Sequence, residues 1–295
     1  MPGPADYQRR TSVVRGILAV LLAMFLFAAM DAINKHQSQT YAATQILWIR
    51  YGVFFLFALW LARRNVRAYA RSKRPLLQSV RSFILVAEML TFVVALRYMP
   101  IADVHAIAAV TPLMVTALSL PMLGERVDLR QWLAVLGGFV GVLVIVRPGF
   151  IALDWPVLIV IAGSAMFAFY QIALRVVSRD DPPETSVLYS AVVGLAAVSF
   201  VGPLQWQAPD ASSWVLFVVA SLLGCIAHLA MTKALDYAPA AIVQPYSYTL
   251  MVWAAVMGLV VFDQFPDAWT IVGGAIVAAS GLYAWFAARA APAAR

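Results

Sequence analysis

The sequence predicts an all-helical protein that passes through a membrane many times. Of its 295 residues, 63% are hydrophobic and 12% are charged, and the mean hydropathy is +0.84. A soluble chain holds about 45–50% apolar and about 25% charged residues. The apolar residues also gather in long runs that short polar turns separate. Since only lipid solvates this much apolar surface, we expect a polytopic membrane protein.

Ten of the apolar runs are long enough to span a bilayer. A transmembrane helix needs about 20 mostly apolar residues to cross a hydrocarbon core of roughly 30 Å. None of the runs has the alternating pattern of an outer-membrane strand, so we expect every span to be a helix. The predicted spans are 13–35, 42–62, 76–97, 101–120, 130–147, 154–175, 185–203, 213–235, 240–262 and 268–288.

The chain repeats itself about halfway along its length. The hinge Ala-Leu-x-Tyr-x-Pro at 95–100 occurs again at 234–239, and the run 44–48 corresponds to 185–189. This repeat predicts two units, 1–149 and 150–295, with five spans each. Because five is odd, the second unit enters the membrane upside down. Inverted repeats of this kind place a substrate site near the midplane, where the two halves meet.

The Lys and Arg residues predict the orientation of the spans. If the N-terminus is cytoplasmic, 17 of the 21 Lys and Arg residues lie on the cytoplasmic side, most densely in the segment 63–74. Cytoplasmic loops carry such an excess of Lys and Arg. We therefore expect both termini to face the cytoplasm. The net charge of +7 is explained by this orientation, and no nucleic-acid partner is expected.

Signatures of enzymes and metal sites are missing from the sequence. It contains no G-x-x-x-x-G-K-[ST] phosphate loop, no H-E-x-x-H motif and no close His/Cys cluster. The single cysteine, Cys225, excludes an intrachain disulfide. We therefore expect no enzymatic activity, no cofactor and no metal. The expected partners are the lipid bilayer and a small-molecule substrate.

Glu88 is the acidic residue closest to the centre of a predicted span. A lipid-facing carboxylate there costs roughly 2.5–3.5 kcal/mol, so such groups usually face a cavity. Glu88 is then either a cavity carboxylate that meets a substrate ammonium or a proton, or a structural carboxylate paired with a neighbouring helix.

Other candidate substrate-binding residues are polar, aromatic or helix-breaking residues in the third, fourth, eighth and ninth spans. They are Thr91, Tyr98, His105, Pro112, His228, Thr232, Gln244, Tyr246, Tyr248 and Trp253. Pro112 and Pro245 each free a carbonyl one turn earlier, and such carbonyls are tolerated where they line a cavity. His228 either exchanges protons or is hydrogen-bonded between helices. For Tyr98 and Tyr237, an interfacial aromatic belt is the alternative.

A second group of residues near the span ends is predicted to form gates. Asp31 and Lys35 lie one turn apart near the outer end of the first span, and their repeat counterparts are Gln171 and Arg175. Arg50, inside the second span, completes the group. The alternative for Asp31 is a helix-end ion pair. Glycines at 137–141 and 273–281 allow close helix packing, either within one chain or between two, so monomer and homodimer stay open.

The pattern as a whole resembles a known family. Two five-span halves, the Ala-Leu-x-Tyr-x-Pro hinges and Gly124-Glu125-Arg126 resemble the drug/metabolite transporter superfamily, EamA type. The likeness covers almost the whole chain, but Asp263-Gln264 stands where a Gly-Glu pair is usual. Length and aromatic content are similar to YddG-type amino-acid exporters.

This resemblance implies export of amino acids, aromatic and other neutral ones, or of similar small metabolites across the bacterial cell inner membrane. Together with the inverted repeats, it predicts a secondary transporter that works by alternating access. Uptake or exchange of another metabolite, such as a nucleoside derivative, is the alternative within transport. A channel would need polar rings along a continuous pore. A membrane enzyme or receptor is disfavoured by the missing catalytic motifs.

Overall fold

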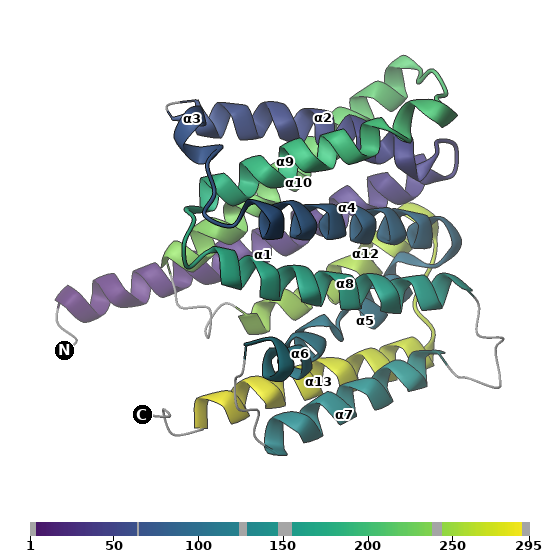
Figure 1. Cartoon of the computed structure of the whole chain (residues 1–295). Coiled ribbons are helices and arrows are strands. Elements are labelled where there is room, and N and C mark those ends of the chain that lie inside the picture. The colour runs from purple at the N-terminus through teal and green to yellow at the C-terminus, as the bar shows by residue number, and fades with distance from the viewer. Residues whose placement is uncertain (1–3, 64, 124–128, 147–154, 238–243, 291–295) are drawn as a thin grey trace.

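A computed structural model describes residues 4–63, 65–123, 129–146, 155–237 and 244–290 (Figure 1). Every regular element in these ranges is a helix. The first half holds α1 (Pro4–Ser38), α2 (Ala43–Ala62), α3 (Val66–Tyr69), α4 (Pro75–Tyr98), α5 (Ile101–Ala108), α6 (Thr111–Leu123) and α7 (Leu129–Val146). The second holds α8 (Trp155–Val177), α9 (Pro183–Ser199), η1 (Gly202–Gln205), α10 (Ala211–Tyr237), η2 (Gln244–Tyr248), α12 (Thr249–Phe262) and α13 (Ala268–Ala290).

The helices fit a membrane. Seven described segments are long and apolar enough to span it, and two shorter apolar helices, Trp132–Val146 and Tyr246–Phe262, accompany them. Helix α9, with 17 residues, is shorter than any of these seven segments. The all-helical polytopic class is thus confirmed. The count of ten spans and the side on which the termini lie remain predictions.

The predicted fourth span is broken in its middle. Helix α5 ends at Ala108, and α6 begins at Thr111. Pro112 has no amide hydrogen, so it leaves the carbonyl of Ala108 without its usual helical donor. The hydroxyl of Thr111 donates to this carbonyl at 2.7 Å and replaces that donor. The freed carbonyl predicted from Pro112 therefore exists, but a neighbouring side chain satisfies it.

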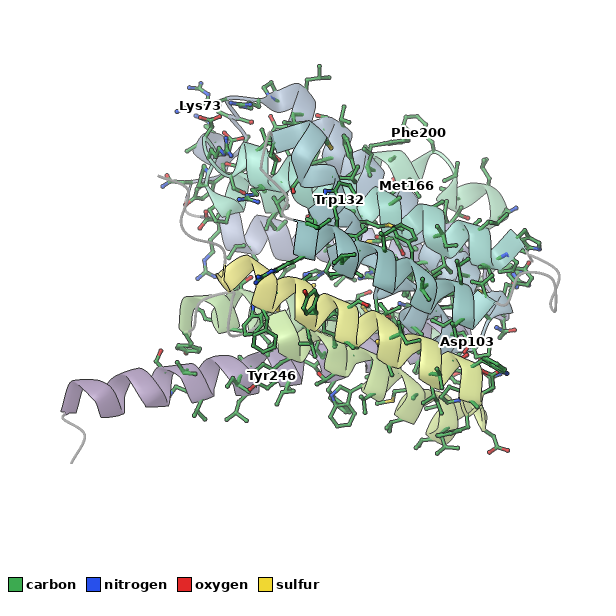
Figure 2. All side chains as sticks on the ribbon, turned by 90° about the horizontal axis from the view of Figure 1, so that it is seen from below. Lys73, Asp103, Trp132, Met166, Phe200 and Tyr246 are labelled. Atoms are coloured by element: carbon green, nitrogen blue, oxygen red, sulfur yellow. The ribbon has the colours of Figure 1, made fainter. Side chains whose placement is uncertain are left out.

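Helices of the two halves pack against each other throughout the bundle. Helix α1 lies along α10, α4 along α8, α2 along α9 and α7 along α13. Helices α5 and α12 also meet. In Figure 1 the beginning of α1 and the end of α13 lie at the same end of the bundle as α3. Lys73 lies at this end too, whereas Asp103 lies at the opposite end (Figure 2).

Glycines bring α7 and α13 together within one chain. A Cβ atom on Gly141 would lie 2.8 Å from the carbonyl oxygen of Gly273, and one on Gly273 would lie 2.6 Å from the oxygen of Gly141. A Cβ atom on Gly137 would lie 2.7 Å from Oγ of Ser280. These glycines therefore serve packing between the two halves, which was one of the two readings left open by the sequence.

Candidate functional site

Glu88 points into the bundle and keeps accessible surface there. It lies on the face of α4 that also carries Arg81, which is 0% exposed, and Phe92, whose ring packs edge-on against His105 at 5.2 Å. Residues such as Leu76 and Phe83, exposed at 78% and 59%, mark the opposite, lipid-facing side of α4. Glu88 itself is half-buried. A half-buried carboxylate on an inward face lines space inside the bundle, as predicted for a cavity residue.

Arg50 of α2 reaches the same level of the bundle from another side. Its Nη2 atom lies 3.5 Å from the position that a Cβ atom would take on Gly224 of α10, and Sδ of Met30 lies 2.9 Å from that position. The missing side chain at Gly224 therefore makes room for the guanidinium group. The next residue, Tyr51, contacts the residue after Glu88, because its hydroxyl lies 3.5 Å from Sδ of Met89. Gly224 is one turn before His228 on α10.

His228 lies on the same stripe of α10 as the buried Gly224 and Cys225, and the residue is exposed. Its ring contacts Phe27 of α1 edge-on, with centroids 5.0 Å apart. Thr232, one turn later, donates to the carbonyl of His228 at 2.9 Å. Arg50, Glu88 and His228 thus belong to one layer of the structure, although they come from three helices.

Asp31 and His105 bring the first and fourth predicted spans together. Nε2 of His105 lies 3.3 Å from Oδ2 of Asp31, at an angle that does not make a hydrogen bond. Nδ2 of Asn34 donates to Oδ1 of Asp31 at 3.3 Å. The ring of His105 in turn packs against Phe92, one helical turn after Glu88. Asp31, predicted as a gate residue, is therefore part of the surroundings of Glu88.

Lys35 has a separate role from Asp31. Its Nζ donates to the carbonyls of Leu96 at 2.8 Å and Met99 at 2.5 Å, at the end of α4. A cation at a helix C-terminus is favourable because carbonyls there lack amide donors. Nζ also lies 5.4 Å from the ring centroid of Phe262. Lys35 therefore ties the end of α1 to α4 and α12.

Several other predicted site residues pack elsewhere. The Tyr248 hydroxyl lies against Gly281 of α13, where a Cβ atom would be 1.5 Å from it. Tyr246 and Trp253 pack against α1, the latter edge-on to Phe25 at 5.2 Å. Tyr98 is 56% exposed and contacts Trp155. The structure does not bring these aromatics into the layer of Glu88.

The remaining candidates lie as follows. Thr91 donates to the carbonyl of Glu88 at 2.7 Å and packs on Gly163 of α8, and Pro112 is exposed on α6. Gln171 is half-buried in α8, with Arg175 exposed one turn later. The side chain of Gln244 lies outside the described residues. So do Gly124-Glu125-Arg126, the segment 147–149 and the second hinge from 238 to 243.

Sequence reasoning missed a buried polar network at the α3 end of the bundle. Arg81 donates from Nε to Gln78 at 2.7 Å, from Nη1 to Ser190 at 3.3 Å and from Nη2 to the Ser186 carbonyl at 2.7 Å. Its guanidinium also lies 5.4 Å from the ring centroid of Tyr170. The network joins α4 to α8 and α9. Arginine within an apolar run was the one signal that could have located it.

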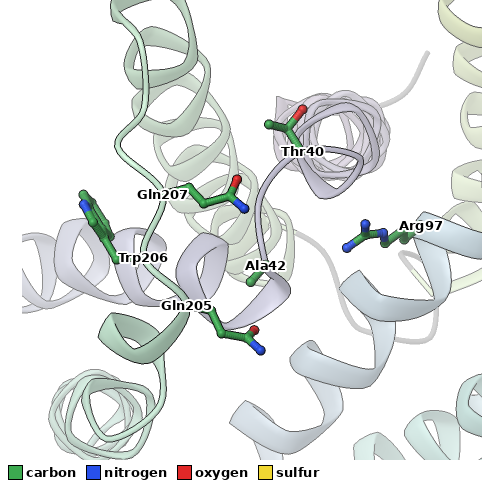
Figure 3. A pocket seen from close by; sticks show the side chains of 6 residues that line it. All are labelled: Thr40, Ala42, Arg97, Gln205, Trp206 and Gln207. Carbon is green, nitrogen blue, oxygen red and sulfur yellow. The ribbon is translucent and has the colours of Figure 1, made fainter.

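Accessible hollows lie at the opposite end. One, of about 420 Å³, is lined by Thr40, Ala42, Arg97, Gln205, Trp206 and Gln207 (Figure 3). A second, of about 280 Å³, shares Ala42, Arg97 and Gln205 and extends along α4 to Leu90. Leu90 lies on the side of α4 that carries Phe83, and Glu88 lies on the other side. The bundle is thus hollowed at this end, and polar contacts join its halves at the other.

Metal chemistry has no built site in the described part of the chain. No group of three or more His, Cys, Asp and Glu side chains comes close enough there to hold a metal ion. The arrangement instead offers isolated opposite charges, a histidine and aromatic rings around accessible space. Such groups bind and orient a small polar molecule.

Known proteins similar to this chain are transporters. The EamA-like transporter family matches twice, at residues 14–147 and 154–285. A riboflavin transporter of Vibrio cholerae is 25% identical over 90% of this chain and 91% of its own length. The pseudopaline exporter CntI of Pseudomonas aeruginosa is 29% identical, over 89% and 93%.

Two further comparisons extend this result. An S-adenosylmethionine uptake transporter of Rickettsia prowazekii is 22% identical, over 92% of each chain. A solved crystal structure superposes with a TM-score of 0.62 at 18% identity and covers 93% of this chain and 97% of the other, which shows a shared fold. The chain therefore belongs to the EamA-like transporter family and is a multi-pass transporter of the bacterial inner membrane, not an enzyme.

Proposed function

We propose that the protein is a secondary transporter that exports amino acids, aromatic and other neutral ones, or similar small metabolites. The observation that carries this proposal is the half-buried Glu88 on the inward face of α4. A carboxylate in the middle of a membrane bundle is costly unless it has a function or a partner. A substrate ammonium group fits its charge.

The proposal includes two inverted five-helix halves, 1–149 and 150–295, with ten spans and both termini in the cytoplasm. Two observations support it. The family matches each half separately. The helix contacts also follow a two-fold pattern, because α1 with α10 corresponds to α8 with α4 when the halves are exchanged. Likewise, α1 with α12 corresponds to α8 with α6.

The difference between the two ends of the bundle supports the alternating-access part of this proposal. Contacts between α4 and α8–α9 join the halves at the α3 end, whereas hollows open the other end. Substrate would reach the layer of Glu88 from one end at a time as the halves rock against each other. The described state has its α3 end closed.

Uptake of another metabolite is the second candidate. It is favoured by the similarity to the S-adenosylmethionine uptake transporter of Rickettsia prowazekii and the riboflavin transporter of Vibrio cholerae. Both candidates share the carrier mechanism and differ in substrate and direction.

Counterflow in proteoliposomes tests the proposal. Vesicles loaded with unlabelled substrate should accumulate labelled substrate transiently if the protein is a carrier. Amino acids, S-adenosylmethionine and riboflavin are each offered in turn, with protein-free vesicles as the control. Simple equilibration without overshoot would indicate a channel. No protein-dependent flux of any compound would contradict the proposed function.

A further inference from the structure

Arg50 and Glu88 are opposite charges that lie near each other without joining. Their chain neighbours touch, because the Tyr51 hydroxyl lies 3.5 Å from Sδ of Met89. Among the described residues, however, neither charged group makes a hydrogen bond or an ion pair within 4.0 Å.

Both charged residues keep accessible surface. Arg50 and Glu88 are half-buried, and Glu88 lies on the inward face of its helix. A structural ion pair inside a membrane bundle is expected to close into direct contact, because separated charges lose attraction and stay poorly solvated. This pair is instead open, and both members keep part of their surface accessible.

The surroundings keep the two charges apart. The Arg50 guanidinium sits against Gly224 of α10, in the second half of the chain. Glu88 is carried by α4, in the first half. A molecule between them meets a cation on one side and a carboxylate on the other.

We propose that Arg50 and Glu88 bind the two ends of one zwitterionic substrate, Arg50 its carboxylate and Glu88 its ammonium group. This inference rests on the proposed transport function and names its substrate class as α-amino acids and derivatives that keep both charges. A guanidinium binds a carboxylate with two parallel hydrogen bonds, which an ammonium side chain cannot reproduce. Arg50, predicted as a gate residue, then becomes a substrate-binding residue.

The experiment compares ligands of one shape that differ in charge. L-Phenylalanine has both charged groups, 2-phenylethylamine lacks the carboxylate, and 3-phenylpropionate lacks the ammonium group. The same comparison is made with the other natural amino acids and their amides, and S-adenosylmethionine and riboflavin complete the panel. Binding is measured by ligand-induced thermal shift of the purified protein, and flux by counterflow.

We expect zwitterions to bind at least tenfold more tightly than their singly charged analogues. Arg50→Gln should remove the preference for a free carboxylate over an amide, while the affinity for the amide changes less than threefold. Arg50→Lys should restore part of the preference, since it keeps the charge but not the paired donors. Arg97→Gln, in the hollow of about 420 Å³, is the matched control and should leave the preference unchanged.

The outcomes separate the inference from the proposed function. Flux of riboflavin without binding of any zwitterion would overturn the inference and leave the transporter standing. Equal affinity of zwitterions and amides would overturn it too, as would an unchanged preference in folded Arg50→Gln. If no compound in the panel binds or moves, the proposed function fails together with the inference. If Arg50→Gln does not fold, the inference is tested by comparing Arg50→Lys with the unmodified protein. The preference for a free carboxylate over an amide should then be weaker in Arg50→Lys, and an equal preference would overturn the inference.

Discussion

Gln78 and Asp181 connect the two halves of the chain at the α3 end of the bundle. Nε2 of Gln78 donates to Oδ2 of Asp181 at 2.9 Å. Ser72 donates to the same oxygen, and the backbone amide of Lys73 donates to Oδ1 at 2.9 Å. Asp181 therefore holds both the start of α4 and the segment before it against the turn between α8 and α9.

These hydrogen bonds predict how Asp181 affects stability with pH. Burial raises the pKa of Asp181, but the hydrogen bonds from Gln78, Ser72 and Lys73 outweigh it and hold the pKa below its ordinary value. A carboxylate with a lowered folded-state pKa stabilises the fold at neutral pH, and this contribution is lost as pH falls below about 4. Asp181→Asn should lower stability by about 1–3 kcal/mol at pH 7.

The measurement is the melting temperature of the purified protein between pH 3 and pH 7. The difference between Asp181→Asn and the unmodified protein should shrink toward the acid end, because both side chains are then uncharged. Asp263→Asn is the control for charge alone, since Asp263 is exposed at the end of α12. A difference that stays constant over this range would contradict the role given to the carboxylate.

The contact between Gly141 and Gly273 predicts a second effect on stability. A Cβ atom on Gly141 would meet the Gly273 carbonyl at 2.8 Å and the Val277 amide nitrogen at 3.0 Å, and backbone atoms cannot rotate away. Gly141→Ala should therefore separate α7 from α13 at a cost of about 1–3 kcal/mol. Gly52→Ala is the matched control, because a Cβ atom there meets nothing within 4 Å. Equal melting temperatures of the two variants would show that the helices do not pack this closely.

The orientation of the bundle can be checked at Ala68. This residue is exposed in α3, within the segment rich in Lys and Arg. Ala68→Cys in a Cys225→Ser background should react with an impermeant maleimide in inverted vesicles and not in intact spheroplasts, since Lys and Arg gather on the cytoplasmic side. Labelling from outside would reverse the topology and the assignment of both ends.

Much of the fold was predictable because apolar runs of spanning length leave few alternatives. The predicted run 76–97 became α4 at 75–98, and the run 154–175 became α8 at 155–177. The freed carbonyl before Pro112 followed from the sequence, but the hydrogen bond that Thr111 donates to it did not, because that bond depends on a side-chain rotamer. What the glycines contact could not be predicted from the sequence. Small residues allow close helix packing both within one chain and between two chains.

The candidate site was predictable residue by residue but not as an arrangement. Burial cost marks Glu88 as functional from the sequence, and Arg50 stands out for the same reason. Their proximity depends on how α2 and α4 pack, which no local pattern contains. Lys35 was grouped with Asp31 because one helical turn separates them. In the structure, however, its ammonium group donates to a carbonyl at the end of α4. Tyr170 is one aromatic residue among many until the contact with Arg81 singles it out.

The Glu88→Gln variant tests whether Glu88 binds substrate or stabilises the fold. In the described part of the chain the carboxylate has no ion pair that the substitution would break. The variant should therefore lose at least tenfold in flux while its melting temperature changes little. A structural partner would instead be left buried and uncompensated, at a cost of about 3–5 kcal/mol. Normal flux would exclude Glu88 from the site, and a collapsed melting temperature would favour the structural alternative.

The last prediction concerns the closed end of the bundle, where Arg74 of the first half meets Asp180 of the second. Nε of Arg74 lies 2.7 Å from Oδ2 of Asp180, and their side chains are 48% and 29% exposed. An exposed ion pair of this kind contributes about 0–1 kcal/mol, so replacing it should not unfold the protein. Cysteines at both positions, in a Cys225→Ser background, can then be joined by a short cleavable cross-linker.

If transport requires this end to open, the cross-link between Arg74→Cys and Asp180→Cys should stop counterflow, and cleaving the linker should restore it. The control is Arg71→Cys with Arg74→Cys, which lie in the same segment of one half and should tolerate cross-linking. Binding should survive in the cross-linked protein, because the cross-link leaves the hollows at the other end unchanged. Loss of flux with retained binding is the result that alternating access requires, whereas full flux after complete cross-linking would show that the halves do not separate here.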